Sequence, residues 1–419
     1  MSTAAPAVAT PSALSPARVR LALLALALGG FGIGATEFVA MGVLPEIAQD
    51  LLPELVARSP EEAIARAGIM ISAYAAGVVV GAPTIAVVAA RFPRKGLLVA
   101  LATAFTVGTL ASAVAPTFEL VVLARFVAAL PHGAYFGIAA LVAASLMGPG
   151  KRGQGIALVL SGLTIANVVG VPAITSLGQQ AGWRVAYLAV AAIFALTVVA
   201  VLALVPRQPG DPGATMRREL GAFGRPAVWF ALLTGTLGFG GFFAVYTYVA
   251  PLTTEITALD AAFVPLALVM LGVGMTVGNF VGGRLADAGA LRAVYILFGV
   301  LAASLLFLAL TAPTVPGLFA GLFAVGAASA AISPAIQTRL MDVAGDSQTL
   351  AAAVNHSALN LGNSLGAFLG GAVIAAGWGY VAPTWLGLAL CLPGFLAAIA
   401  GGLVTHGEAT RARRAADAG

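Results

Sequence analysis

Long runs of apolar residues separated by short polar segments make up most of this chain. A membrane-spanning helix needs about 20 mostly apolar residues. Runs of that length begin near twelve positions: Val19, Ala67, Gly96, Phe118, Gln154, Trp183, Ala227, Ala262, Ala293, Pro316, Leu350 and Val381. The pattern therefore predicts an all-α membrane protein with about twelve transmembrane helices. The first run is too long for the apolar part of a cleavable signal peptide, so we expect it to be retained as the first helix.

Composition supports a bilayer as the solvent of this fold. Of the 419 residues, 60% are hydrophobic and only 9% are charged, whereas a soluble domain carries about 25% charged residues. A soluble fold of this length would have too little polar surface to cover itself. The single cysteine, Cys391, lies in an apolar run and has no partner for an internal disulfide, so we expect it to pack between helices.

The basic residues predict the orientation of the chain. If the N-terminus is cytoplasmic and every run crosses the bilayer, all but four of the 21 basic residues lie at the cytoplasmic side or in the tails there. The exceptions are Arg58, Arg66 and Arg184 on the outer side and Arg125 inside the membrane. An excess of Lys and Arg is typical of cytoplasmic loops. We therefore expect a multi-pass protein with both termini in the cytoplasm.

A Pro-, Gly- and Arg-rich stretch at 206–225 is the longest polar interruption on the inner side, and it is typical of a linker. It divides the chain into a predicted N-terminal six-helix bundle at 19–205 and a C-terminal six-helix bundle at 226–404. Residues 1–18 and 405–419 are predicted to be cytoplasmic tails.

The two halves also share short motifs in the same order. SGLTIAN at 161–167 corresponds to SALNLGN at 357–363, and the sequence AGW occurs at both 181–183 and 376–378. Spacings near half the chain length indicate a duplicated six-helix unit. Parallel repeats of this kind, related by an axis along the membrane normal, occur in major facilitator transporters.

Four segments carry a more specific resemblance. They are GIGATEFVAMGVLPEIAQDL at 32–51, MISAYAAGVVVG at 70–81, LPHGAYFG at 130–137 and GLTIANVVGVP at 162–172. With them the chain resembles the drug:proton antiporter branch of the major facilitator superfamily. It is most similar to bacterial inner-membrane transporters of the chloramphenicol-resistance and arabinose-inducible efflux type.

The resemblance implies export of a small organic molecule in exchange for protons, by alternating access, in a bacterial inner membrane. It implies no cofactor other than the proton as coupling ion, and no metal. The expected partners are the small-molecule substrate and the lipid bilayer, without nucleic acid. We expect a monomer, because the two halves of one chain together form the pathway.

Three ionisable residues, Glu37, Arg125 and His132, lie deep inside apolar runs. Ionisable groups are costly at membrane depth and usually mark ion, proton or substrate pathways. The resemblance places helices 1, 4, 7 and 10 around a central cavity, and Glu37 lies about midway along helix 1. A carboxylate there keeps its proton when desolvated and releases it when a cation approaches. The alternative is a Glu37 that only pairs with Arg125 to hold two helices together.

Arg125 and His132 lie seven residues apart in the fourth run, which places them on nearly one face of a helix. Phe136 lies on the same face. Arg125 would act as a fixed positive charge or as one partner of a structural salt bridge between helices. His132 titrates near neutral pH and could relay protons. Alternatively, it could bond to backbone groups that Pro131 frees.

Other polar and aromatic residues are candidates for the wall of the cavity. Asparagines at membrane depth can also hold helices together, and aromatic residues can simply pack, so these alternatives stay open. The candidates are Met41, Tyr135, Phe136, Asn167, Phe243, Tyr246, Asn360 and Asn363.

The family signature between helices 2 and 3 has a glycine, an aspartate four residues later and then basic residues. The first half has Ala86 and Ala90 at the glycine and aspartate positions, whereas the second half has Gly283 and Asp287. The resemblance implies a cytoplasmic gate at these loops. The candidate gate residues are Arg91, Arg94, Lys95, Gly283, Arg284 and Asp287.

Motifs for other classes of protein are missing from the sequence. It has no G-x-x-x-x-G-K-[ST] phosphate loop, no H-E-x-x-H zinc motif and no Ser/His/acid set, so we do not expect an enzyme. A proton-coupled uptake symporter for a sugar or nucleoside remains an alternative on the same fold. A non-transporting membrane receptor is a third reading, and no output domain favours it.

Overall fold

Two packed groups of helices form the molecule, and the order of helices follows the apolar runs. The computed structural model describes residues 15–58, 63, 66–89, 91–210, 217, 220–260, 263–345 and 347–417. Every regular element in that part of the chain is helical. The signature position Ala90 and most of the first predicted tail lie outside the described residues.

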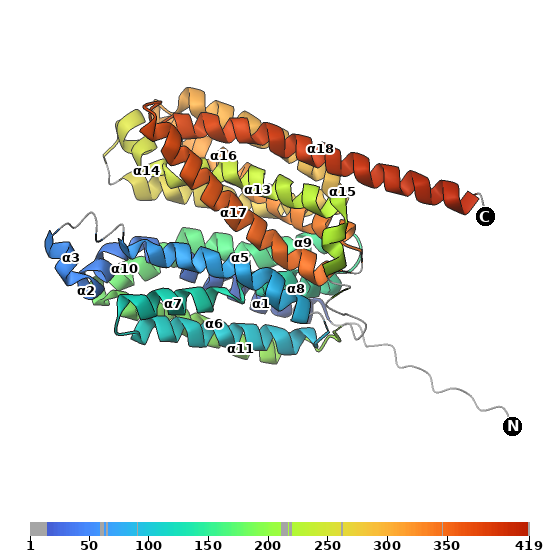
Figure 1. Cartoon of the computed structure of the whole chain (residues 1–419), viewed down its shortest axis with the longest axis horizontal. Helices are drawn as coiled ribbons and strands as arrows, with labels where there is room; N and C mark the ends of the chain where they lie inside the picture. The colour runs from blue at the N-terminus through green and yellow to red at the C-terminus, as the bar shows by residue number, and fades with distance from the viewer. Residues whose placement is uncertain are drawn as a thin grey trace.

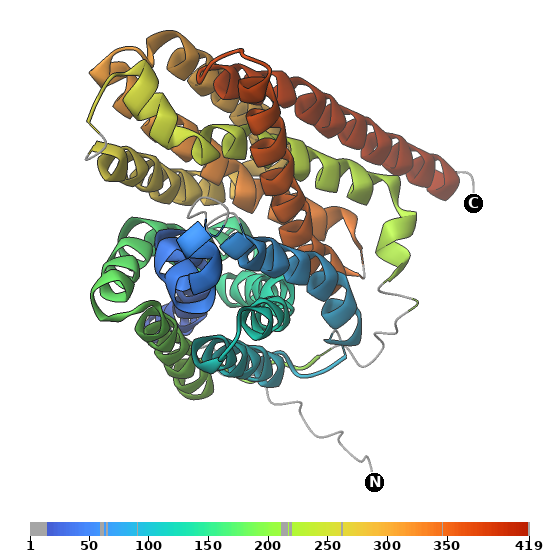
Figure 2. The same ribbon diagram turned by 60° about the vertical axis from the view of Figure 1, so that its left-hand side comes forward.

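The first group contains the helices up to residue 204. They are α1 (Pro16–Gly42), α2 (Leu44–Leu51), α3 (Pro53–Arg58), α5 (Ile69–Ala89), α6 (Arg94–Val114), α7 (Phe118–Ala129), α8 (His132–Met147), α9 (Arg152–Ile165), the π-helix η1 (Ala166–Gly170), α10 (Val171–Ala181) and α11 (Trp183–Leu204). In Figures 1 and 2 this group is blue to green.

The second group begins after the short 3-10 turn η2 (Gly221–Gly224). Its elements are α13 (Pro226–Thr247), α14 (Val249–Pro251), the π-helix η3 (Leu252–Ile256), α15 (Val264–Thr311), α16 (Val315–Val343), α17 (Gln348–Ala375) and α18 (Ala382–Asp417). Figure 1 shows this yellow-to-red group beside the first, with both chain ends at the same end of the molecule. We call this the terminal end, and the end at α3 and α14 the far end.

The predicted number of crossings agrees with the helices. In the described part of the chain, ten helices are long and apolar enough to cross a membrane, and Ile69–Ile85 is a shorter apolar helix. One of the ten, α15, has 48 residues and would be about 72 Å long if straight, more than twice the apolar thickness of a bilayer. Its helical dihedral angles are interrupted at Gly289 (φ 148°), so it makes two crossings. Counting α15 twice and adding α5 gives twelve, and the all-α prediction is confirmed.

Each group has its own apolar core. One cluster of buried side chains draws almost entirely on α1 to α11 and the other almost entirely on α13 to α18. Large apolar side chains are also exposed on the outside of both groups, as expected for helices that face lipid. The exact domain boundaries remain a prediction.

Two local breaks shape the middle of the first group. The fourth apolar run is divided at Leu130 and Pro131 into α7 and α8, because proline has no backbone N–H to continue the helix. The fifth run contains η1, in which the N–H of Val171 donates to the carbonyl of Ala166. Pro172 follows immediately and lacks a donor. Short π-helical turns of this kind often occur at functional sites.

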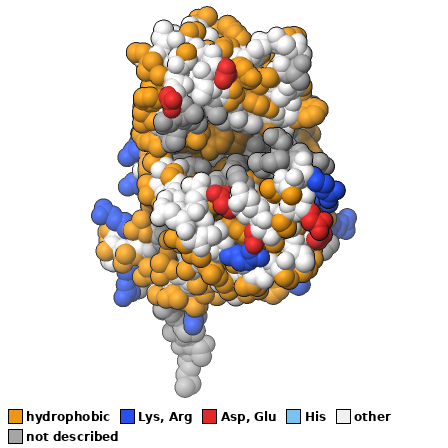
Figure 3. Space-filling view, turned by 90° about the vertical axis from the view of Figure 1, so that its left-hand side faces the viewer, with side chains coloured by type: hydrophobic (Ala, Val, Ile, Leu, Met, Phe, Trp, Pro, Cys, Tyr) orange, Lys and Arg blue, Asp and Glu red, His pale blue; other side chains and the backbone are white. Residues whose placement is uncertain are grey.

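The two groups touch closely at the terminal end. Gly133 and Gly137 of α8 pack against the backbone of Ala353 in α17, with no room for a side chain between them. Gly153 at the start of α9 packs in the same way against Gly283 of α15. At the far end, by contrast, Figure 3 shows the surface hollowed between the two halves. The molecule is therefore closed at the terminal end.

Candidate functional site

A cavity between the two groups of helices contains most of the polar side chains at mid-depth. Its described walls come from α1, α8, α9 and η1 on one side and from α13, α15, α16 and α17 on the other. The fifth, eighth and eleventh runs therefore line it together with the four that the resemblance implied. The cavity offers about 80 Å³ to the centres of water molecules.

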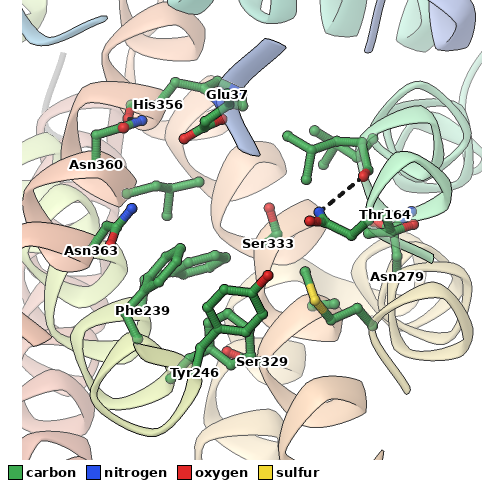
Figure 4. A pocket seen from close by; sticks show the side chains of 18 of the residues that line it. Glu37, Thr164, Phe239, Tyr246, Asn279, Ser329, Ser333, His356, Asn360 and Asn363 are labelled. Carbon is green, nitrogen blue, oxygen red and sulfur yellow. Dashed lines mark hydrogen bonds between the residues drawn. The ribbon is translucent and has the colours of Figure 1, made fainter. Parts of the chain in front are cut away.

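Glu37 faces this cavity from α1, as predicted (Figure 4). Its side chain is half-buried, and none of the three ion pairs among the described residues involves it. It interacts electrostatically with Arg125 but forms no salt bridge with it. The reading of Glu37 as half of a structural ion pair is therefore wrong.

Arg125 lies behind the cavity wall, where it is 1% exposed and is not a lining residue. Its Nη1 donates to the carbonyl oxygen of Thr36 at 2.8 Å and to the Thr36 hydroxyl at 3.0 Å. The guanidinium also lies over the ring of Tyr74, with its carbon 4.3 Å from the ring centroid. Arg125 is thus held at Thr36, the residue before Glu37. From there its charge acts on Glu37 without a direct ion pair.

His132 is the first residue of α8 and lines the cavity. Its Nδ1 is hydrogen-bonded to the Tyr74 hydroxyl at 3.3 Å, so its partner is a side chain rather than backbone freed by Pro131. Its ring lies 5.4 Å from that of His356 in α17. The contacts therefore run from Arg125 through Tyr74 and His132 to the second half. Arg125 and His132 both contact Tyr74, and the ring centroids of His132 and Phe136 lie 5.4 Å apart, so these side chains follow one side of the fourth run across the break at Pro131.

Five of the predicted cavity residues line the cavity. Amide groups are placed there by η1 and α17, and aromatic rings by α13. The five are Asn167, Phe243, Tyr246, Asn360 and Asn363.

Two predicted wall residues do not line the cavity. Tyr135 is directed into its own bundle, where its hydroxyl donates to the carbonyl of Leu26 at 3.1 Å and its ring fills the space above Gly29. Phe136 is buried and stacks on His356, with ring centroids 4.4 Å apart. Both predictions were wrong because the rings on α8 pack between helices. The side chain of Met41 lies outside the described residues.

Several lining residues were not predicted. Phe239 and Phe242 share a face of α13 with Phe243 and Tyr246, and their 3-, 4- and 7-residue spacings would have revealed that face. Five further polar residues line the cavity. These are Thr164, Asn279, Ser329, Ser333 and His356. The serine pair on the tenth run and His356 with Asn360 on the eleventh each have the four-residue spacing that a helix face predicts.

The predicted gate residues of the second half connect the two groups at the terminal end. The Asp287 carboxylate accepts hydrogen bonds from the N–H of Gly153 at 2.6 Å and from the N–H and Nε2 of Gln154 at 3.2 and 2.9 Å. It thereby caps the first turn of α9, where free N–H groups and the helix dipole favour a negative charge. Gly283 allows the close approach of α9. Among the described residues, Arg284 donates to the carbonyl of Phe280 in its own helix, at 3.4 Å.

The basic residues of the first half bond within their own half. Arg94 Nη1 donates to Gln208 at 3.4 Å, and Lys95 Nζ donates to the carbonyl of Leu202 at 2.7 Å. The Arg91 guanidinium lies over the ring of Phe92, 4.9 Å from its centroid. The gate is therefore asymmetric in the described residues, with a bridging carboxylate from the second half.

The sequence profile of the Major Facilitator Superfamily matches residues 26–287 and 245–418 of this chain. Inner membrane transport protein YdhP of Escherichia coli (strain K12) is 40% identical over 366 residues, covering 87% of this chain and 91% of that protein. The putative transporter AraJ of the same strain is 32% identical, covering 85% and 89% of the two chains. A chloramphenicol resistance protein of Streptomyces lividans is also 32% identical, covering 87% and 92%.

Solved structures of low sequence identity have the same fold. The human organic anion transporter MFSD10 matches with a TM-score of 0.74 at 15% identity, covering 92% of this chain and 100% of that one. The proton:xylose symporter XylE matches with a TM-score of 0.72 at 16% identity, covering 92% and 95%.

Proposed function

The chain belongs to the major facilitator superfamily of multi-pass membrane transporters, and from that premise we propose that it exports a small organic molecule in exchange for protons. The family and the relatives are transporters, not enzymes. Export by antiport goes further than family membership. It draws on the chloramphenicol resistance protein among the relatives and on the chemistry of the cavity.

The observation that carries the proposal is the placement of Glu37. Its carboxylate faces a cavity between the two halves and has no ion-pair partner among the described residues. An ionisable group at membrane depth is retained at a cost, and in transporters such groups relay protons. A carboxylate open to the cavity can bind either a proton or a polar group of the substrate. Competition between the two couples their movements.

The closed and hollowed ends fit alternating access. Gly137 packs against α17 at the terminal end, while the far end is hollowed between the halves (Figure 3). With cytoplasmic termini in a bacterial inner membrane, this state would receive protons from outside and release substrate there. Opening the contacts of α8 with α17 and of α9 with α15 would expose the cavity to the cytoplasm. No cofactor other than the proton is needed, and a monomer suffices because one chain forms both walls.

Uptake symport of a sugar or nucleoside is the alternative. Proton symporters such as XylE share the fold, and a cavity carboxylate serves symport equally well. Direction therefore has to be measured.

A transport experiment tests both points. Proteoliposomes with an imposed pH gradient and a pH-sensitive dye would report proton movement when candidate compounds are added, for wild type and Glu37→Gln. A growth screen of an efflux-deficient bacterial host with antibiotics, dyes, sugars and nucleosides would supply the compounds. We expect resistance and substrate-dependent proton release with wild type, and loss of both with Glu37→Gln.

The exposed acid Glu119 at the start of α7 offers a matched control, because Glu119→Gln removes a carboxylate away from the cavity. Coupled transport by the Glu37→Gln protein at the wild-type rate would overturn the coupling role. Proton movement in the same direction as the compound would establish symport instead.

A further inference from the structure

We propose that the cavity selects lipophilic compounds that carry a protonated amine with at least one N–H group. This inference names the substrate class of the transport function proposed above and rests on it. It follows from three features of the lining: its charge, its hydrogen-bonding groups and its aromatic wall.

The charge of the lining favours a cation. Glu37 is the one carboxylate among the described lining residues, and no Lys or Arg lines the cavity with it. The guanidinium of Arg125, which interacts electrostatically with Glu37, is buried behind the wall and bonded to Thr36. His132 and His356 are the remaining titratable groups that face the cavity, together with the Tyr246 hydroxyl. An anionic substrate would approach the carboxylate of Glu37 with no lining cation to balance it.

The hydrogen-bonding groups favour a donor. Each of three lining asparagines uses its amide nitrogen on a helix carbonyl: Asn167 on Leu163 at 3.1 Å, Asn279 on Ala157 at 2.5 Å and Asn360 on His356 at 3.0 Å. Thr164 likewise donates its hydroxyl proton to the backbone carbonyl of Ser161, at 3.1 Å. No donor from the described residues bonds to the amide oxygens of these asparagines.

The free oxygens surround the cavity. Figure 4 shows Asn360 and Glu37 on one side, and Asn279 and Thr164 on the other. Oxygens that accept hydrogen bonds complement an ammonium group, which has only donors to offer. The two serines, Ser329 and Ser333, can act in either role.

The aromatic wall favours a lipophilic cation. Phe239, Phe242, Phe243 and Tyr246 line the cavity from one face of α13. Neighbouring rings contact one another, with the Phe242 and Phe243 centroids 5.1 Å apart. Phe38 of α1 meets the Tyr246 ring edge-on at 6.4 Å. Such a wall binds apolar groups and attracts cations through the faces of the rings.

These features distinguish protonated amines from related classes of compound. A quaternary ammonium has the charge and can bind the rings, but it cannot donate to the amide oxygens. A neutral alcohol can donate but gains nothing from Glu37. Hydrogen bonds that involve a charged partner typically contribute enough to change affinity by about tenfold or more each.

Binding by four probes that share a phenylbutyl group tests the selection. The probes are phenylbutylamine, trimethyl(phenylbutyl)ammonium, phenylbutanol and phenylbutyrate, titrated calorimetrically into the full chain in lipid nanodiscs near pH 7. We expect the amine to bind about tenfold more tightly than the quaternary compound and the alcohol, and phenylbutyrate to bind most weakly. Equal or tighter binding of the carboxylate, the alcohol or the quaternary compound would overturn the proposal.

Two variants assign the preference to the amide oxygens. Asn279→Leu and Asn360→Leu should each reduce the affinity for the amine roughly tenfold and leave that for the quaternary compound nearly unchanged. The control is Gln180→Leu, which removes an exposed amide of α10 far from the lining. Retained binding of the quaternary compound shows that a variant is folded. If neither variant folds, the ranking of probes on the wild type still decides.

The outcomes separate this inference from the function on which it rests. The predicted ranking without any proton exchange would refute the antiport proposal and support the amine site. Proton-driven export of neutral or anionic compounds, with no preference for the amine, would refute the amine site and support antiport.

Discussion

The carboxylate of Asp287 accepts a hydrogen bond of 2.6 Å from the backbone N–H of Gly153, and this contact joins the second half of the molecule to the first. Asp287 belongs to α15 and Gly153 to the first turn of α9. One side chain thus caps a helix of the opposite half and holds the terminal end closed.

Removal of that cap should loosen the closed end. In Asp287→Ala, the first turn of α9 loses the acceptor for three hydrogen bonds, and helix caps contribute about 1–2 kcal/mol. We expect a shift of about tenfold or more toward states with α9 and α15 apart. Spin labels at the exposed residues Lys151 and Arg292, in a Cys391→Ser background, would report longer distances by electron paramagnetic resonance.

The control for this prediction is Glu408→Ala, which removes an exposed acid of α18 that forms no ion pair among the described residues. Distance distributions that are the same for wild type and Asp287→Ala would show that the carboxylate does not hold the closed end.

A single methyl group at Gly137 should also separate the two halves. A Cβ there would lie 2.8 Å from the nitrogen and 3.0 Å from the Cα of Ala353, and backbone atoms cannot turn away as a flexible side chain can. Gly137→Ala should therefore lower the stability of the closed state by about 1–3 kcal/mol, as overpacking typically does. Thermal unfolding in detergent and reactivity of cysteines introduced at the terminal end would measure the effect.

Gly96 provides the matched control for Gly137, because a Cβ at Gly96 meets nothing within 4 Å. Gly96→Ala should be neutral or slightly stabilising, since alanine favours a helix over glycine. Equal behaviour of the two variants would contradict the steric argument.

Arg125→Lys should not preserve function despite its conserved charge. The guanidinium donates to two oxygens of Thr36 while lying over the ring of Tyr74, whereas an ammonium is a compact point charge without a planar face. We expect a loss of stability of about 1–3 kcal/mol and slower proton-coupled exchange, measured by thermal unfolding and by the proteoliposome assay. Arg284→Lys is the control, because Arg284 is exposed and its hydrogen bond, within the part of the chain that the structure describes, is to its own helix. Wild-type exchange by Arg125→Lys would show that only the charge matters.

An ion pair outside the membrane predicts a pH dependence of stability. The Arg184 guanidinium donates to the Asp50 carboxylate, and Trp183 Nε1 donates to it at 3.0 Å. The hydrogen bond from Arg184 is the main reason that the pKa of Asp50 lies below its ordinary value of 3.8. A lowered pKa means that the contribution to stability is present above pH 4 and is lost as the pH falls through the folded-state pKa.

Asp50→Asn should therefore lower the melting temperature slightly above about pH 5, with a difference from wild type that shrinks below about pH 4. The effect should stay below about 1 kcal/mol, because the Asp50 and Arg184 side chains are 46% and 36% exposed and water screens them. Differential scanning fluorimetry across this pH range would check it. A difference that grows on acidification would contradict the assigned sign.

The sequence alone determined the architecture, since the length of an apolar run fixes how often a helix can cross a bilayer. It also predicted that Glu37 faces the cavity, because a carboxylate within an apolar run is conspicuous in any fold. The position of Asn167 followed from the repeat, since equivalent motifs occupy equivalent places in the two halves. The asymmetry of the gate could be predicted in part from the sequence, because the position that corresponds to Asp287 in the first half is Ala90.

The tertiary structure decided which side of each helix faces the cavity. In a soluble protein the buried face of a helix is apolar and the other face is polar, so the sequence reveals the orientation. In a bilayer, the faces toward lipid and toward neighbouring helices are both apolar, so that signal is lost. The sequence pattern therefore does not show which of the aromatic residues Tyr135 and Phe242 faces the cavity. In the structure, Tyr135 fills the space above Gly29 and Phe242 lines the cavity. The separation of Arg125 from Glu37 likewise depends on how α1, α5 and α7 pack, which no local pattern encodes.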